Sequence, residues 1–119
     1  MRKIKTLKLN YEFKNVFTKG SFCYGNQVIG YILKNKYDYN RFGVAISKHL
    51  CKAVKRNRIK RVIRAAYQEV SKKEVMQGYD IVFIWNKNIN IEELDYHIIE
   101  KDINKIFEKS GILNEKSMH

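Results

Sequence analysis

The chain has 119 residues, of which 45% are hydrophobic, and a formal net charge of +12 at pH 7. This length and composition predict a single domain, residues 1–119, with one buried core. No apolar run approaches the roughly 18 residues of a membrane-spanning helix, so we expect no membrane partner, and the positive charge favours a nucleic acid.

The charge is unevenly distributed along the chain. Residues 1–73 contain 19 basic and 3 acidic residues, whereas residues 74–119 contain 5 basic and 9 acidic residues. We therefore expect the cationic surface to come from the first two thirds. Residues 1–8 are predicted to be a basic arm, mobile or extended across the surface until an anion orders it. Because the arm leads into no apolar segment, we expect no signal peptide and a cytoplasmic protein.

The first part of the chain predicts one helix and three strands. Phe13, Val16 and Phe17 have helical spacing from Asn10 onward, and Gly20 supplies a stop. A short strand is expected near residues 21–24. Alternating apolar residues predict two longer strands, residues 27–35 and 41–47, joined by a hairpin-like connection through residues 36–40.

The most informative stretch is Lys48 to Arg64, which contains eight Lys or Arg and no carboxylate. Helical spacing predicts an amphipathic helix. Its apolar stripe comprises Ile59, Val62, Ile63, Ala66 and Val70. The opposite face comprises Arg56, Asn57, Lys60, Arg61, Arg64 and Tyr67, with Arg58 on the flank.

This helix lacks the acids that normally alternate with Lys on a solvated face. No Asp or Glu occurs between Asp38 and Glu69, so like charges would repel along the helix. A phosphate backbone would supply the missing countercharge, and the pattern therefore indicates an RNA-binding helix rather than a merely solvated basic face.

The rest of the chain predicts a strand and a closing helix. Tyr79–Trp85 is a near-continuous apolar run, typical of a central strand that is buried on both faces. Asn90 and Glu93 resemble a capping box, and an apolar stripe from Leu94 continues to Phe107. Residues 112–119 are expected to form a short tail. The predicted fold is α+β, a small sheet packed with helices.

Candidate catalytic and metal-binding groups are few. Cys23 and Cys51 are far apart and have no companion at zinc-ligand spacing, so we expect two reduced thiols. His49 lies beside Lys48 and Lys52 and has no nearby carboxylate to orient it as a base. We therefore predict no catalytic residue and no protein-bound metal.

The stretch from residue 52 to residue 64, KAVKRNRIKRVIR, closely resembles the bacterial ribonuclease P protein subunit, whose hallmark is an Arg-Asn-Arg helix followed by Lys-Arg and a further Arg. The resemblance extends to Phe13, Val16, Phe17 and Gly20, and to residues 41–48 and 78–82. The chain has His49 where the family often has Lys, Cys51 where it often has Gly, and Trp85-Asn86 where it commonly has an Arg.

The resemblance implies the protein component of a ribonucleoprotein endonuclease. In this family a catalytic RNA, with Mg²⁺, removes the 5′ leader of precursor tRNA, and the protein assists in tRNA 5′ maturation. The implied partners are therefore the RNA subunit and precursor tRNA, with no DNA expected. The implied fold is an α/β sandwich with a mostly antiparallel sheet and a left-handed βαβ crossover.

The resemblance also assigns roles to individual residues. The helix would contact the RNA subunit near bound metal, and a cleft would receive the single-stranded leader. Asn57 could contact a base, a 2′-hydroxyl or a metal-bound water, or brace neighbouring Arg side chains. The expected RNA-binding residues are Arg41, Lys48, Lys52, Arg56, Asn57, Arg58, Lys60, Arg61 and Arg64.

Phe13, Phe17 and Tyr31 match the aromatic residues of the family's leader cleft. Periodicity alone predicts instead that all three are core residues, so both interpretations stay open at this point. The alternative function is a general RNA-binding or ribosomal-type protein, which would share the charge and the size.

Overall fold

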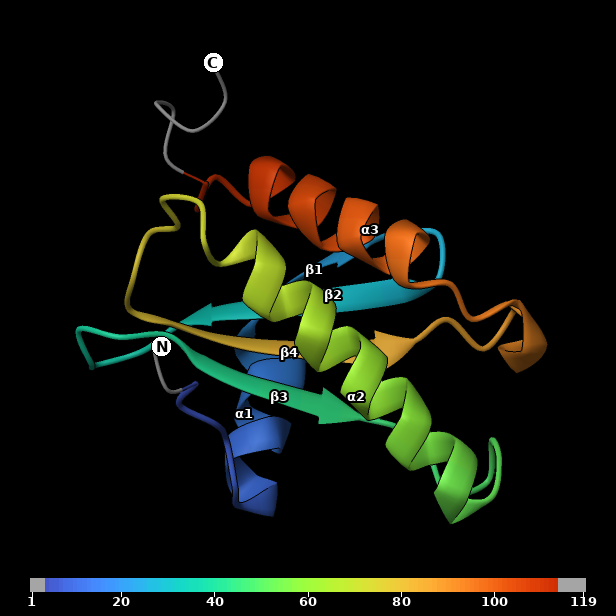
Figure 1. Ribbon diagram of the computed structural model, residues 1–119. Coiled ribbons are helices and arrows are strands. Elements are labelled where there is room, and N and C mark those ends of the chain that lie inside the picture. Colours follow the sequence, from blue (N-terminus) through green and yellow to red (C-terminus); the bar gives the residue numbers. More distant parts are fainter. Residues whose placement is uncertain (1–3, 114–119) are drawn as a thin grey trace.

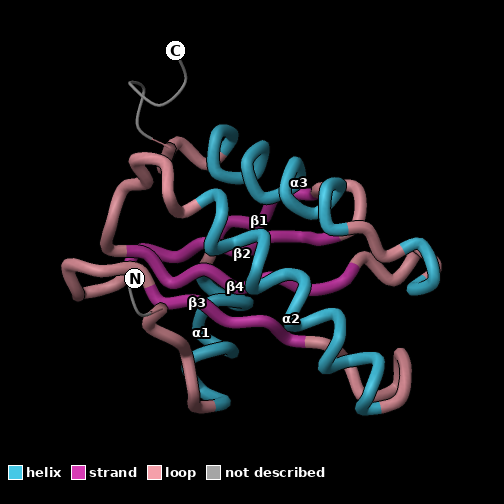
Figure 2. The backbone as a smooth tube through the Cα atoms, in the orientation of Figure 1, coloured by secondary structure: helices cyan, strands magenta, loops and turns pink. Residues whose placement is uncertain are grey.

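The computed structural model describes residues 4–113, which contain three α-helices, one short 3-10 helix and a four-stranded sheet (Figures 1 and 2). The elements in chain order are α1 (Asn10–Lys19), β1 (Ser21–Tyr24), β2 (Val28–Lys34), β3 (Arg41–Ala45), α2 (Ala53–Val70), β4 (Tyr79–Trp85), η1 (Ile91–Glu93) and α3 (Tyr96–Lys109).

The strand order is β1-β2-β4-β3, so β4 occupies the predicted central position. β4 pairs antiparallel with β2 and parallel with β3, while β1 pairs antiparallel with β2. The sheet is therefore mostly antiparallel, as expected. The predicted hairpin-like connection between β2 and β3 is wrong, because β4 lies between these two strands. A strand that is apolar on both faces is most stable when it is flanked on both edges and covered on both sides.

β3, α2 and β4 form a βαβ unit with a left-handed crossover. In Figure 1 both strands point to the right, α2 crosses in front of the sheet, and β4 lies above β3. This hand is opposite to the one that nearly all βαβ units adopt, and it agrees with the fold that the resemblance implied.

Different helices pack on the two faces of the sheet. α2 and α3 lie on one face and α1 on the other (Figures 1 and 2). The main core fills the space between the sheet and the α2/α3 layer, and it confirms the predicted apolar stripes of both helices. Its buried members include Ile59, Ile63, Ala66 and Val70 of α2, Ile81, Phe83 and Trp85 of β4, and Ile99, Ile103, Ile106 and Phe107 of α3.

α1 covers only part of the other face. A small cluster of Leu7, Val16 and Val82 is buried beneath it, and Phe13 packs against this cluster. The close approach depends on Gly43, because a Cβ there would lie 2.7 Å from Cε1 of Phe13.

Another part of this face lies beside α1. Ile29 of β2 and Ile84 of β4 are paired across the two strands and are only partly buried. Alternation along each strand places them on the same face as Tyr31 and Val82. An apolar surface therefore remains accessible beside α1.

The basic stretch is not helical throughout. Residues 48–51 form a turn and a bend, and α2 begins only at Ala53. Tyr67, predicted on the cationic face, is instead buried and stacks on Phe42, with ring centroids 4.3 Å apart. This burial raises the pKa of the Tyr67 hydroxyl to about 12. A wide helix face is buried because α2 packs against both the sheet and α3.

The closing helix begins later than predicted. Asn90 caps η1, since its side chain accepts a hydrogen bond from the backbone of Glu92, whereas α3 begins at Tyr96 and is capped by Asp95. Two consecutive cap signals in this segment correspond to two separate helices. Leu94, whose backbone N–H donates to the carbonyl oxygen of Ile91, lies between them.

Both ends of the described chain are tied to the fold. Thr6 bridges to Phe42 beside β3 and Leu7 is buried, so this part of the predicted basic arm packs on the protein. Ile112 and Leu113, predicted as the start of the tail, are also buried. Residues 1–3 and 114–119 lie outside the described part.

Candidate RNA-binding surfaces

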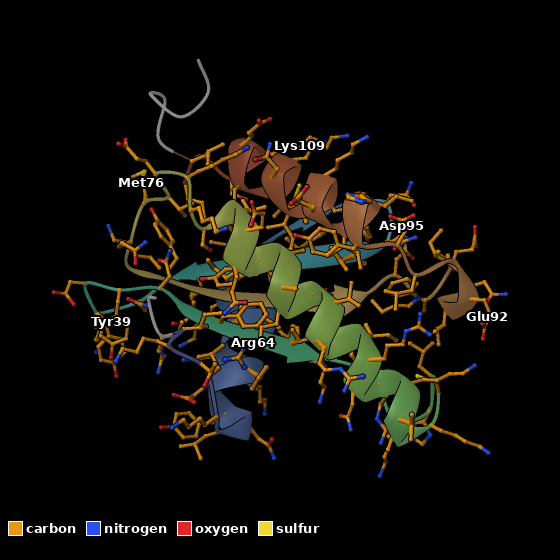
Figure 3. All side chains as sticks on the ribbon, viewed as in Figure 1. Tyr39, Arg64, Met76, Glu92, Asp95 and Lys109 are labelled. Atoms are coloured by element: carbon orange, nitrogen blue, oxygen red, sulfur yellow. The ribbon has the colours of Figure 1, made fainter. Side chains whose placement is uncertain are left out.

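The N-terminus of α2 has no internal acidic cap. Lys52 occupies the capping position without a side-chain hydrogen bond, and the first turn contains no acid. In α3, by contrast, the Asp95 carboxylate accepts hydrogen bonds from the backbone N–H groups of His97 and Ile98 (Figure 3). Free N–H groups and the helix dipole make the start of a helix attractive to anions, so α2 presents this feature to solvent.

Arg56 fixes the loop that precedes α2. Its Nη1 donates hydrogen bonds to the carbonyl oxygens of Cys51, at 2.6 Å, and Lys48, at 3.3 Å, and the residue is half-buried. This predicted RNA-binding residue therefore also has a structural role, which holds the loop against the first turns of the helix.

Most of the other predicted RNA-binding residues form one exposed surface. Side chains that end in nitrogen gather around the N-terminal half of α2 (Figure 3). We call the exposed members the basic surface: Lys48, Lys52, Asn57, Arg58, Lys60, Arg61 and Arg64.

One acid lies at the border of the basic surface. Glu92 of η1 forms an ion pair with Lys55 of α2, with 2.7 Å between Oε1 and Nζ, and both side chains are exposed. The hydrogen bond between them raises the pKa of Lys55 and lowers that of Glu92. The pair links the first turns of α2 to the segment after β4.

Arg41 does not belong to this surface, because its guanidinium is engaged inside the protein, and its contact with RNA stays a prediction. Its Nε and Nη2 donate to the two carboxylate oxygens of Asp80, at 2.8 and 2.7 Å, and its Nη1 donates to Glu12 at 2.7 Å. Its side chain is only 17% exposed, and its guanidinium lies 4.8 Å from the ring centre of Tyr37. The hydrogen bonds to Asp80 raise the pKa of Arg41 further above its usual range.

The second candidate surface lies on the α1 side of the sheet. Phe17 of α1 meets Tyr31 of β2 edge to face, with ring centroids 4.9 Å apart. The ring centroid of Phe22 of β1 lies 5.9 Å from that of Tyr31 and 5.5 Å from that of Tyr24. We call these four residues, Phe17, Tyr31, Phe22 and Tyr24, the aromatic row.

The predicted cleft residues differ in exposure. Phe17 is 36% exposed and Tyr31 is partly buried, so both can present ring surface to a ligand. Phe13 is also partly buried, but it packs on Gly43 and the small core cluster under α1. Its role is therefore closer to that of a core residue.

Sequence reasoning missed the two aromatic residues of β1. Phe22 pairs with Tyr31 across the sheet, and Tyr24 pairs with Ile29. The signal was present in the alternation of Ser21–Tyr24, which places Phe22 and Tyr24 on one face. Only the strand pairing, however, showed that this face is the one that carries Tyr31.

Within residues 4–113 no group of three or more His, Cys, Asp or Glu could hold a metal ion. In the same range no helix is long and apolar enough to cross a membrane.

Comparison with protein families and sequences gives one consistent result. The ribonuclease P family model matches residues 1–111. A ribonuclease P protein component from Fusobacterium nucleatum is 41% identical over 112 residues, covering 92% of this chain and 100% of that protein. One from Clostridium botulinum is 38% identical and covers 91% of this chain and 96% of that protein.

Solved structures agree with the sequence matches. The RNase P protein of Staphylococcus aureus has a TM-score of 0.76 at 28% identity, covering 94% of this chain and 100% of that chain. The RNase P protein of Thermotoga maritima has a TM-score of 0.76 at 24% identity, covering 88% of this chain and 96% of that chain. At this lower identity the likeness supports the fold alone.

Proposed function

Because the chain belongs to the bacterial ribonuclease P protein family, we propose that its basic surface binds the RNA subunit and its aromatic row binds the single-stranded 5′ leader of precursor tRNA. The family assignment makes it the protein component of the endoribonuclease that matures the 5′ end of tRNA, in which the RNA carries the catalysis. The observation that carries the proposal is that the two surfaces lie on opposite faces of one sheet.

The basic surface suits a folded RNA. Its cations project from one helix and the loop before it. The uncapped N-terminus of α2 adds a further feature that attracts anions. Phosphate contacts of this kind position a protein on RNA without reading sequence, which is what assembly with a structured RNA requires. The exposed amide of Asn57 adds one group that can donate and accept hydrogen bonds.

The aromatic row suits a single strand. Every base has a π-face, and stacking on an aromatic side chain contributes about 1 to 3 kcal/mol per base with little dependence on sequence. Phe17 and Tyr31 lie beside the accessible apolar surface around Ile29. A leader strand could therefore lie across this face while the basic surface holds the RNA subunit.

In this proposal Mg²⁺ acts with the RNA subunit, and the complex works in the cytoplasm. The described residues fit that division of roles, because several carboxylates already form ion pairs with Lys or Arg side chains of the protein. Glu92 is paired with Lys55, and Asp80 and Glu12 are paired with Arg41. The protein would then position RNA and leave the activation of water to the RNA subunit and its ions.

The alternative of a general RNA-binding or ribosomal-type protein is set aside. Such a protein would share the charge and the size, but the family match spans nearly the whole chain, residues 1–111.

The test is Phe17→Ala in the reconstituted holoenzyme, with precursor tRNAs whose leaders differ in length. We expect the variant to weaken binding of leader-bearing substrates by about 1 to 3 kcal/mol and to leave binding of mature tRNA unchanged. Tyr11→Ala is the matched control, since Tyr11 is also on α1 and is 67% exposed.

The opposite result would assign Phe17 to the core. Replacing a buried Phe by Ala lowers the free energy of unfolding of a protein by about 3 to 5 kcal/mol. A melting temperature that drops accordingly, or an equal loss of affinity at every leader length, would remove Phe17 from the leader site.

A further inference from the structure

The edge strand β1 carries two large aromatic side chains in solvent. Phe22 is 59% exposed and Tyr24 is 62% exposed, and the two rings meet edge to face at 5.5 Å. Edge strands of soluble proteins usually avoid such side chains, because they promote association. Two neighbouring exposed rings on a short edge strand therefore indicate a ligand.

The position of these rings indicates which ligand. Phe22 contacts Tyr31, which in turn contacts Phe17, so aromatic contacts run without a break from α1 to the sheet edge. Successive rings are 4.9 to 5.9 Å apart. This spacing exceeds the roughly 3.4 Å per nucleotide of a strand in a duplex, and it suits a single strand whose bases are unstacked.

The charge near the row also favours a polyanion. Glu12 is the acid of α1, and its carboxylate is engaged by Arg41. Lys14 and Lys19 on the same helix are exposed, and Lys19 lies two residues before the start of β1. A strand of RNA would meet cations and rings together, the combination that single-strand binding proteins use.

We propose that Phe22 and Tyr24 form a second leader subsite, which stacks one or two nucleotides beyond those held by Phe17 and Tyr31. The inference rests on the proposed function of the aromatic row. It extends the binding face from α1 and β2 to the sheet edge. The protein would thus hold a longer stretch of single-stranded RNA than Phe17 and Tyr31 alone.

The experiment measures binding of precursor tRNAs with graded leaders to the holoenzyme carrying Phe22→Ala, Tyr24→Ala or both. We expect each change to weaken binding at least about fivefold, the lower end for one lost stacking contact, and only for certain leader lengths. The lengths affected should differ from those affected by Phe17→Ala. Tyr11→Ala should have no effect, and 4-thiouridine placed along the leader should crosslink to Ser21–Tyr24.

The outcomes separate the two proposals. If Phe17→Ala weakens leader binding while the β1 variants do not, and no crosslink reaches β1, the second subsite is excluded and the first stands. If Phe17→Ala has no leader-dependent effect, the proposed leader site at Phe17 and Tyr31 fails. If the double variant changes only the oligomeric state in sedimentation, β1 is an interface with a second copy, and the subsite is overturned.

Discussion

The guanidinium of Arg41 lies between carboxylates from two other elements, Glu12 of α1 and Asp80 of β4. Asp80 is 5% exposed and also accepts a hydrogen bond from the side chain of Asn35. At the scale of single residues, charge alone does not identify an RNA contact. What matters is whether the cation already has a partner inside the protein.

The first prediction compares Arg41→Ala with Arg64→Ala. Removing Arg41 leaves a buried carboxylate without its cation, and we expect a loss of about 3 kcal/mol in the free energy of unfolding. Arg64 is exposed, so its removal should change stability by less than about 0.5 kcal/mol and weaken binding to the RNA subunit. Denaturant unfolding measures the stability of both variants, and filter binding measures their affinity for the RNA subunit. Equal stability losses in the two variants would contradict the structural role of Arg41.

The second prediction concerns Glu12 and pH. Its carboxylate accepts hydrogen bonds from the backbone N–H groups of Leu9 and Lys8 and from Arg41, and these contacts lower its pKa below the usual 4.5. The charged form is favoured by folding, so its stabilisation is complete above that value and disappears as the pH falls through the lower pKa of the folded state.

Glu12→Gln should therefore destabilise the protein at neutral pH by about 1 to 3 kcal/mol, and the difference from the wild type should shrink below pH 4.5. Thermal unfolding of both proteins across this pH range is the measurement. A difference that does not vary with pH would show that the ionised carboxylate is not the stabilising form.

At the scale of elements, α3 holds the turn between β1 and β2. The buried carboxylate of Asp102 accepts hydrogen bonds from the backbone N–H groups of Asn26, Gln27 and Val28, at 2.8, 2.7 and 3.1 Å. Gly25 permits the contact, since a Cβ there would lie 2.6 Å from Cγ of Asp102. The helix thereby fixes the turn that leads from the exposed strand β1 into β2.

The third prediction is that Asp102→Asn will destabilise the protein by about 2 to 4 kcal/mol. The amide nitrogen would face backbone donors, and both the charge and at least one hydrogen bond would be lost. Asp95→Asn is the matched control on the same helix, because Asn also caps helices well and should cost only a few tenths of a kcal/mol. Hydrogen exchange at Asn26 to Val28 should accelerate in the first variant and not in the second.

At the scale of the whole molecule, many acids have partners within the fold, whereas most cations of α2 face solvent. Among the described residues of the acidic last third, Asp80 holds Arg41, Asp102 holds a turn, Asp95 caps a helix and Glu92 pairs with Lys55. Many of the acids thus work within the fold. Most cations of α2 and its preceding loop stay exposed, which leaves a strongly positive surface for the proposed contact with RNA.

The fourth prediction is the salt dependence of assembly with the RNA subunit. The basic surface contains six exposed cations, Lys48, Lys52, Arg58, Lys60, Arg61 and Arg64. If all six meet phosphates, the logarithm of the binding constant should fall with the logarithm of salt concentration at a slope of about −4 to −5. Lys60→Ala should make the slope less steep by about one. Binding that is insensitive to salt would rule out a phosphate interface.

The sequence by itself determined the elements and the basic face. Helical and alternating periodicities depend on local geometry, so α1, β4 and the apolar stripes of α2 and α3 could be predicted from residue spacing. The family motif in residues 52–64 added what periodicity could not provide, the left-handed crossover. The cationic character of α2 followed from its many Lys and Arg residues together with the missing acids.

Only the tertiary structure decided which residues face solvent and which have partners. The sequence does not distinguish Arg41 and Arg56 from Arg64. In the fold, however, Arg41 is engaged by Asp80 from a distant strand, and Arg56 by the carbonyl oxygen of Cys51 in the loop before α2. Phe22 and Tyr24 could be placed on the face of Tyr31 only through the register of β1 on β2. Such pairings depend on contacts between segments far apart in the chain or on the exact path of a loop, and local periodicity carries no information about either.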